Sequence, residues 1–263
     1  MENSSHFQIN DYLKPGRHAH LVGIGGVSMR PLGLVLRSMG MQISGSDMNA
    51  SVSTDELMAK GIAVSIGHRA ENIEGADCVI RTAAANNDNP EIAAARAAGI
   101  PIFERAQAWG YIMKAYRHAI CVSGTHGKTT TTSMLPQIFM EAGKDPTVMI
   151  GGSLPLLGAG HRVGQGDTII LESCEYCNSF LNFFPTTAVV LDIDADHLDF
   201  FKDLEDVKHS FRRFAELVPA DGLIVANGDD KNTLDALDGL SLVRFGMAET
   251  NDVYGTNFSE DYR

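Results

Sequence analysis

The sequence is poor in cysteine and has no long apolar run, and each shortage excludes a class of protein. Its 263 residues include only 4 cysteines, unevenly spaced, which is too few for a disulfide framework. No apolar run reaches the roughly 18 residues that a membrane-spanning helix needs. The N-terminal stretch MENSSHFQIN is polar and lacks the apolar core of a signal peptide. We therefore expect a cytoplasmic protein with reduced thiols and no membrane span.

Positive charge is also scarce. The chain has 33 acidic and 21 basic residues, a net charge of -12 and a pI of about 5.1. This balance argues against a protein whose main task is to grip the phosphate backbone of a nucleic acid, so we expect no nucleic-acid partner. One small anion site remains compatible with it, because local fields decide such binding.

Cys174 and Cys177 form the one C-x-x-C pair in the sequence. Such a pair is compatible with a zinc or redox site, although structural zinc sites usually combine two pairs of ligands. The alternative is two reduced thiols near the end of a strand.

Apolar runs and helical patterns alternate along the chain. HAHLVGIGG predicts a strand followed by a helix that starts near Ser28, SVSTDELMAKG a helix with a Ser/Thr-x-x-Glu start, and NPEIAAARAAG a helix from Pro90 to Gly99. This alternation predicts an α/β protein with a Rossmann-like, doubly wound domain over residues 1–105. A second α/β domain of the P-loop ATPase type, incomplete, is expected over residues 106–263.

The first glycine cluster, LVGIGGVSM, follows a predicted strand and opens a helix. Gly23 and Gly25 match the first two positions of G-x-G-x-x-G, whereas Ser28 occupies the third. Gly26 lies between them, and Asp47 ends the next strand about 20 residues later, where a ribose hydroxyl is bound in dinucleotide folds. The cluster is compatible with a nucleotide site, with an NAD site, or with a tight turn that requires glycine.

The second cluster, SGTHGKTT, has most of what a phosphate loop needs. Backbone N–H groups, the Lys128 amine and the Thr129 hydroxyl follow one another between a strand and a helix. The common spacing G-x-x-x-x-G-K-[ST] would place a glycine at position 122, but Val122 stands there and Gly124 comes two residues later. The cluster is therefore either a shortened phosphate loop or a chance glycine-lysine turn.

Acidic side chains follow the next two predicted strands. Glu172 comes directly after the apolar run IIL, where a carboxylate can help to hold Mg²⁺. The segment VVLDIDADHLDFF brings a further group to the same sheet edge: Asp192, Asp194, Asp196, His197 and Asp199. This group suits a divalent cation beside an anionic substrate, or else it is a solvated loop before a helix capped near Asp203.

These motifs in this order resemble the Mur ligase family. The resemblance rests on GTHGKTTTT, ESCEYCNSF and DIDADHLDFF, preceded by GIGGVSM and GSD, and it covers the chain from about residue 17. The family's shorter loop, G-x-x-G-K-[ST], accounts for the position of Gly124. Members have three domains, and the resemblance implies that this chain holds the UDP-sugar-binding domain and most of the ATP-binding domain, without the C-terminal one.

The resemblance also implies an activity in peptidoglycan precursor synthesis. In the family, ATP phosphorylates the carboxylate of UDP-N-acetylmuramic acid, and the amine of an amino acid, here expected to be L-alanine, attacks the acyl phosphate. ATP and Mg²⁺ are the implied cofactors. The alternatives are a related ligase that adds a preformed peptide or another amino acid, and a UDP-sugar-binding module without catalysis.

Site residues follow from the matched motifs. Lys128 would bind the transferring phosphate, Thr129 and Glu172 would ligate Mg²⁺, and His197 would ligate a second ion. The UDP-sugar would contact Gly23, Gly25 and Gly26 through its pyrophosphate and Asp47 near its ribose. The implied ATP loop comprises Gly124, Thr125, His126, Gly127, Lys128, Thr129 and Thr130.

Overall fold

The computed structural model describes residues 8–256. The chain divides into two compact units and contains two sheets. The first unit contains the residues up to 115 together with 151–163, and the second contains 116–150 and the residues from 164 onward. Within residues 8–256, no helix has the length and apolar character needed to cross a membrane.

The first unit is built on a five-stranded sheet in the order β3-β2-β1-β4-β5, and all of its pairs are parallel. This order confirms the predicted Rossmann-like, doubly wound fold. Its strands are β1 (His18–Val22), β2 (Gln42–Asp47), β3 (Ala63–Ile66), β4 (Cys78–Arg81) and β5 (Ile102–Glu104). Its helices are η1 (Ile9–Asp11), α1 (Met29–Ser38), α2 (Val52–Ala59), η2 (Ala70–Ile73), α3 (Pro90–Ala98) and α4 (Arg105–Met113).

Local capping sets the ends of these helices. Helix α3 begins at Pro90 behind the cap Asn89 and ends at Gly99 in the left-handed conformation, as predicted. Helix α2 differs from the prediction, because Ser51 and Thr54 form its capping box. The Thr54 hydroxyl accepts the Ser51 N–H at 2.8 Å, so a threonine takes the place of the expected glutamate.

A buried carboxylate ties the strand ends of this unit to α3. The Glu91 side chain is inaccessible to solvent and accepts hydrogen bonds from Ser46 Oγ (2.6 Å) and Asn72 Nδ2 (2.5 Å). His68 Nδ1 lies 3.1 Å and His20 Nε2 3.8 Å from its oxygens. Burial, the largest influence, raises the pKa of Glu91, but the nearby His20 imidazole and the hydrogen bonds from Ser46 and Asn72 outweigh it and lower that pKa to about 2.

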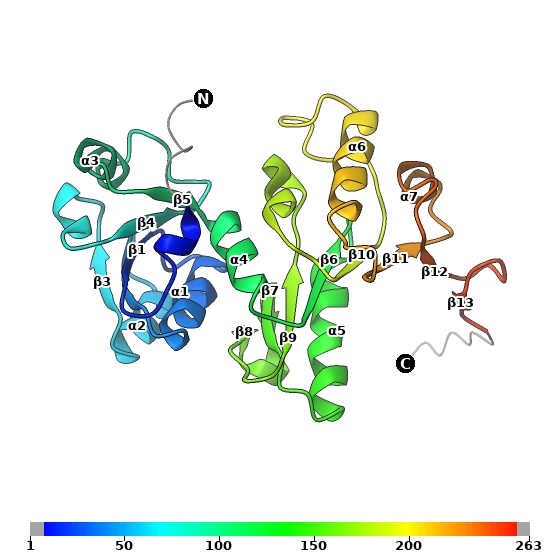
Figure 1. Cartoon of the computed structure of the whole chain (residues 1–263), viewed down its shortest axis with the longest axis horizontal. Coiled ribbons are helices and arrows are strands. Elements are labelled where there is room, and N and C mark those ends of the chain that lie inside the picture. The colour runs from blue at the N-terminus through cyan, green and yellow to red at the C-terminus, as the bar shows by residue number, and fades with distance from the viewer. Residues whose placement is uncertain (1–7, 257–263) are drawn as a thin grey trace. The chain divides into compact units, whose positions relative to one another are not determined.

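The second unit is built on an eight-stranded sheet in the order β13-β12-β11-β10-β6-β9-β7-β8, whose core pairs are parallel. Strand β6 therefore lies between β10 and β9 (Figure 1). The strands are β6 (His118–Ser123), β7 (Thr147–Leu154), β8 (Ala159–Arg162), β9 (Thr168–Glu172), β10 (Thr187–Val190), β11 (Leu223–Asn227), β12 (Val243–Gly246) and β13 (Val253–Tyr254). The helices of the second unit are α5 (Lys128–Glu141), η4 (Tyr176–Asn182), α6 (Leu204–Ala215) and α7 (Lys231–Ala236). The end of β7, η3 (Pro155–Leu157) and β8 fall within residues 151–163, which are counted with the first unit.

Aromatic packing fixes the segment after β9. Phe180 of η4 stacks on Phe214 with ring centroids 4.5 Å apart and meets Phe211 edge-on at 5.3 Å, both from α6. All three rings are buried. Cys177 and Asn178 have positive φ angles of 54° and 55° inside η4, so the segment turns sharply between Glu175 and this anchor. The buried anchor therefore positions the residues that precede η4.

Candidate phosphate and cation site

The predicted phosphate loop lies between β6 and α5 and requires glycine at two points. Gly124 has φ +143° and Gly127, the N-cap of α5, has φ +76°. A Cβ atom on Gly124 would lie 2.9 Å from both Asp192 Oδ1 and Leu191 Cβ, which is too close for a real contact. The glycine that seems misplaced against the longer spacing is thus needed where the loop passes the end of β10.

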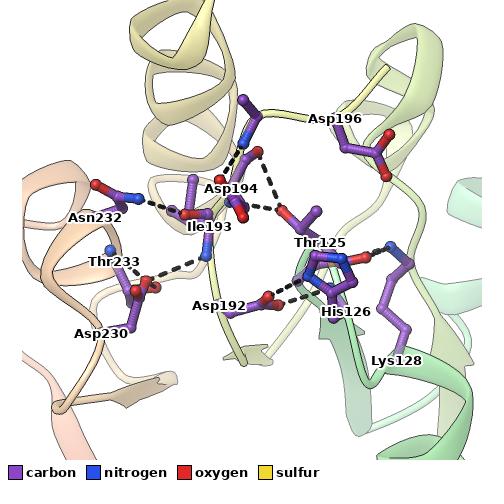
Figure 2. Close-up of polar contacts among 12 residues, drawn as sticks. Thr125, His126, Lys128, Asp192, Ile193, Asp194, Asp196, Asp230, Asn232 and Thr233 are labelled. Carbon is purple, nitrogen blue, oxygen red and sulfur yellow. Dashed lines mark hydrogen bonds and ion pairs between the residues drawn. The ribbon is translucent and has the colours of Figure 1, made fainter. Parts of the chain in front are cut away.

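The segment after β10 holds this loop through Asp192 (Figure 2). One carboxylate oxygen of Asp192 accepts the His126 N–H at 2.7 Å, and the other lies 2.7 Å from His126 Nδ1. The Asp192 carbonyl accepts the Thr125 N–H at 3.1 Å. The hydrogen bond to Asp192 raises the pKa of His126, because the carboxylate stabilises the protonated imidazole.

The same segment is fixed from its other side by α7. Asp230 Oδ2 accepts the Ile193 N–H at 3.2 Å, and Asn232 Nδ2 donates to the Ile193 carbonyl at 2.8 Å. Asp194 N–H donates to the Thr125 hydroxyl at 2.8 Å. Residues 192–194 therefore join the phosphate loop to the first turn of α7, as Figure 2 shows.

Lys128 is the first residue of α5, directly after the glycine loop, and a buried carboxylate holds its amine. Its Nζ donates to the carbonyls of Gly124 (2.5 Å) and Thr125 (3.1 Å) and to both oxygens of Glu175 (3.1 and 3.0 Å). The Glu175 side chain is only 2% exposed. The sequence prediction gave Glu175 no role, since its neighbourhood depends on the turn before η4.

Two pairs of side chains lie around this lysine, and each pair includes a carboxylate. Thr129 Oγ1 donates to Glu172 Oε1 at 2.9 Å, and His197 Nε2 lies 3.7 Å from Glu175 Oε1. Hydroxyl and carboxylate oxygens are the ligands that Mg²⁺ prefers, so the first pair fits this ion. Within residues 8–256, no three His, Cys, Asp or Glu side chains gather as a metal site. Mg²⁺ at Thr129 and Glu172 would therefore need phosphate oxygens and water to complete its coordination.

The predicted UDP-sugar loop is in the first unit, after β1. The N–H groups of Gly23 and Ile24 donate to the Ser46 carbonyl at 2.8 and 2.9 Å, and Gly25 N–H donates to Asp47 Oδ2 at 2.9 Å. A Cβ atom on Gly25 would lie 2.9 Å from that same oxygen. The carboxylate of Asp47 thus fastens the glycine loop to β2, a role that the sequence did not indicate.

None of the four cysteines, all within the described residues, forms a disulfide. Burial raises the pKa of Cys78 and of Cys121 to about 12, so both remain protonated near neutral pH. Cys174 is partly buried and Cys177 is exposed, and neither belongs to a group of three metal-ligating side chains within the described residues.

Together, the fold and the site define a protein with a Rossmann-like unit and a phosphate-loop α/β unit in one chain. The chain belongs to the Mur ligase family: the family's catalytic-domain model matches residues 18–117, and its middle-domain model matches residues 122–263.

Individual relatives agree with this assignment. The chain is 45% identical over 254 residues to a UDP-N-acetylmuramate–L-alanine ligase of Clostridium botulinum, covering 95% of this chain and 55% of that protein. The chain thus spans about half the length of this relative.

Solved structures of the family have the same fold. A UDP-N-acetylmuramate–alanine ligase from Thermotoga maritima matches with a TM-score of 0.78 and 30% identity, over 89% of this chain and 53% of that one. A ligase from Neisseria meningitides, described as joining UDP-N-acetylmuramate to L-alanyl-γ-D-glutamyl-meso-diaminopimelate, matches with a TM-score of 0.80 and 28% identity, over 87% of this chain and 78% of that one.

Proposed function

We propose that this chain is the UDP-sugar-binding and ATP-binding part of a cytoplasmic UDP-N-acetylmuramate–L-alanine ligase. The observation that carries the proposal is the placement of Lys128 over a glycine loop, with Thr129, Glu172, Glu175 and His197 around it. Backbone donors, one cation and carboxylates suited to Mg²⁺ are what phosphoryl transfer needs. The similarity to the Clostridium botulinum relative supports the choice of substrates.

In this proposal the reaction has two steps. A carboxylate oxygen of UDP-N-acetylmuramic acid attacks the γ-phosphorus of ATP and releases ADP, and the L-alanine amine then attacks the acyl carbon and releases phosphate. Lys128 stabilises the negative charge that builds on the transferring phosphoryl group. Mg²⁺, held by Thr129 and Glu172, would neutralise phosphate charge, and His197 would contribute to a second cation.

The first unit would bind the UDP part of the substrate. The loop Gly23–Gly26 would lie against the pyrophosphate, because its glycines carry no side chains and the N-terminal end of α1 favours anions. Asp47 holds the loop through Gly25 N–H and would lie near the uridine ribose. This division assigns the UDP-sugar to the first domain and ATP, with the loop through Thr130, to the second.

A Lys128→Ala variant tests the nucleotide site. We expect it to lower the rate of acyl-phosphate formation by a factor of about 100 to 1000, as loss of a charge-stabilising donor does in other enzymes. Trapping of the acyl phosphate with hydroxylamine measures this step, and calorimetry with Mg²⁺ and ATP measures binding. Lys144→Ala, an exposed lysine after the same helix, is the control and should behave like the parent. An unchanged rate in Lys128→Ala would refute the role of this lysine.

The specific similarity to the Neisseria meningitides ligase supports a second candidate, a ligase that adds a preformed peptide. Product analysis with UDP-N-acetylmuramic acid, ATP and either L-alanine or the tripeptide separates the two. A product with the tripeptide alone would replace the leading proposal. Saturable binding of the UDP-sugar without Mg²⁺-dependent ATP binding would indicate a binding module instead.

A further inference from the structure

His197 has a backbone conformation that its surroundings must maintain. Its φ of +53° is in the left-handed region, which is costly for a residue other than glycine. Its N–H donates to Asp196 Oδ1 at 2.7 Å, and its carbonyl accepts the N–H groups of Phe200 (2.8 Å) and Phe201 (2.9 Å). These bonds hold the backbone of His197 but leave the direction of its imidazole open.

The imidazole of His197 is not fixed by a short hydrogen bond to its carboxylate neighbours. Its Nε2 lies 3.7 Å from Glu175 Oε1 and 4.0 Å from Asp196 Oδ2, both beyond hydrogen-bond length. The ring of Tyr176 packs on it instead, with centroids 4.7 Å apart and planes inclined by 42°. This separation is within the range of favourable aromatic pairs, so the ring contact restricts the imidazole.

Tyr176 contacts the same turn at two more points. Its hydroxyl donates to Asp199 Oδ2 at 2.8 Å, and its ring meets Phe200 edge-on at 6.0 Å. Because Tyr176 follows Glu175 directly in the chain, it connects the Glu175 segment to the His197 turn.

We propose that Tyr176 is a positioning residue that directs the His197 imidazole toward Glu175, through its ring contact with His197 and its hydrogen bond to Asp199. The proposal rests on the proposed function only in assigning His197 to a cation. Packing in the hydrophobic core does not account for Tyr176, because this residue is 37% exposed and its hydroxyl donates to the surface carboxylate of Asp199. Neither the glycine loop nor the acidic motif indicates this residue.

The first test measures the imidazole directly, without nucleotide. In the parent, the Cε1–Hε1 signal of His197, assigned with His197→Gln, should carry a ring-current shift from Tyr176. Tyr176→Phe should keep this shift because it keeps the ring, and Tyr176→Leu should lose it. The proposal would be overturned if the His197 signal had the same chemical shift in Tyr176→Leu as in the parent.

The second test measures ATP affinity with Mg²⁺ and in EDTA. Tyr176→Leu should lower the Mg²⁺-dependent gain in affinity by about tenfold, as loss of an outer-shell partner does at metal sites, and leave the affinity in EDTA unchanged. Tyr176→Phe should lose less. Tyr116→Phe, which removes a hydroxyl bonded to Thr147 Oγ1, is the matched control and should match the parent.

A double-mutant cycle separates positioning from general damage. If Tyr176 acts through His197, adding Tyr176→Leu to His197→Ala should cause no further loss, because the two effects are then not additive. Additive losses, or an equal loss in EDTA, would contradict the positioning role. If the parent shows no Mg²⁺-dependent ATP binding, the proposed function fails, and the imidazole signal still decides whether Tyr176 directs His197.

Discussion

Individual carboxylates in both units accept hydrogen bonds that fix the positions of neighbouring side chains and loops. Glu175 binds the Lys128 amine through both carboxylate oxygens, and Asp192 holds two atoms of His126. In the first unit, Glu91 is a buried carboxylate with hydrogen bonds from Ser46 and Asn72. Glu175 and Glu91 are buried, and buried carboxylates are costly unless they are fully paired, so both should respond strongly to loss of charge.

Replacing Glu91 by glutamine should lower the free energy of unfolding by about 1.5–3 kcal/mol at pH 7, the range for hydrogen bonds to a charged group. The folded state lowers the pKa of Glu91 from 4.5 to about 2, so the carboxylate contributes stability above pH 4.5. This contribution is lost as the pH falls toward 2. Urea denaturation at several pH values should therefore show the parent and Glu91→Gln converging in acid.

The control for this prediction is Glu74→Gln, an exposed glutamate near the same network. Its stability should follow that of the parent at every pH, within about 0.5 kcal/mol. A constant difference between Glu91→Gln and the parent from pH 7 down to pH 2 would show that the charge of Glu91 does not stabilise the fold.

At the scale of elements, the ends of β6, β9 and β10 assemble the phosphate site. Strand β6 lies between the other two, so its loop meets Glu172 at the end of β9 and Asp192 just after β10. Helix α7 then supports the β10 segment through Asp230, which is also the N-cap of α7 and accepts the Thr233 N–H at 2.8 Å. One capping residue thus stabilises both helix α7 and the segment after β10 that contacts the predicted phosphate loop.

Asp230→Ala and Asp203→Ala are matched variants, because each removes the N-cap side chain of one helix, α7 or α6. Asp203 caps α6 by accepting the Asp206 N–H at 3.0 Å, whereas Asp230 also accepts the Ile193 N–H. Each change should lower the free energy of unfolding by about 1 kcal/mol, as loss of an N-cap does. Only Asp230→Ala should also weaken Mg²⁺-dependent ATP binding, by about fivefold if roughly 1 kcal/mol of loop positioning is lost.

Calorimetry and thermal unfolding measure the two effects separately. Equal ATP affinities in both variants would mean that the bond from Asp230 to Ile193 does not support the phosphate loop.

At the scale of the molecule, the proposed ligand groups are divided between the two units. The glycines and Asp47 proposed for the UDP-sugar belong to the first unit, and Lys128, Thr129, Glu172 and His197 belong to the second. Each unit has a core of buried apolar side chains on parallel strands. Each ligand should therefore stabilise the loop of its own unit.

Hydrogen exchange with each ligand alone tests this division. ATP with Mg²⁺ should slow exchange in residues 124–129, and UDP-N-acetylmuramic acid should slow it in residues 23–26. At 100 times its dissociation constant, each ligand should add about 2.7 kcal/mol to the stability of the state that binds it. Protection of residues 23–26 by ATP alone would contradict the assignment of the sites.

The sequence by itself determined the local features of this protein. The alternation of strands and helices predicted an α/β protein with a doubly wound first domain, and the solved relatives confirm this fold class. Pro90 and Gly99 fixed the ends of α3, because capping depends on neighbours within one turn. The short elements β8, α7 and β13 were not predicted, since two to six residues carry too little periodicity to be recognised.

Only the tertiary structure decided which partners these groups meet. Glu175 is 47 residues from Lys128, Asp192 is 66 from His126, and Asp230 is 37 from Ile193. These contacts depend on β6 lying between β9 and β10, an order that local sequence does not specify because strand pairing in a parallel sheet is non-local. The sequence located the glycine loop and its lysine, and the packing of the sheet supplied the carboxylates that hold them.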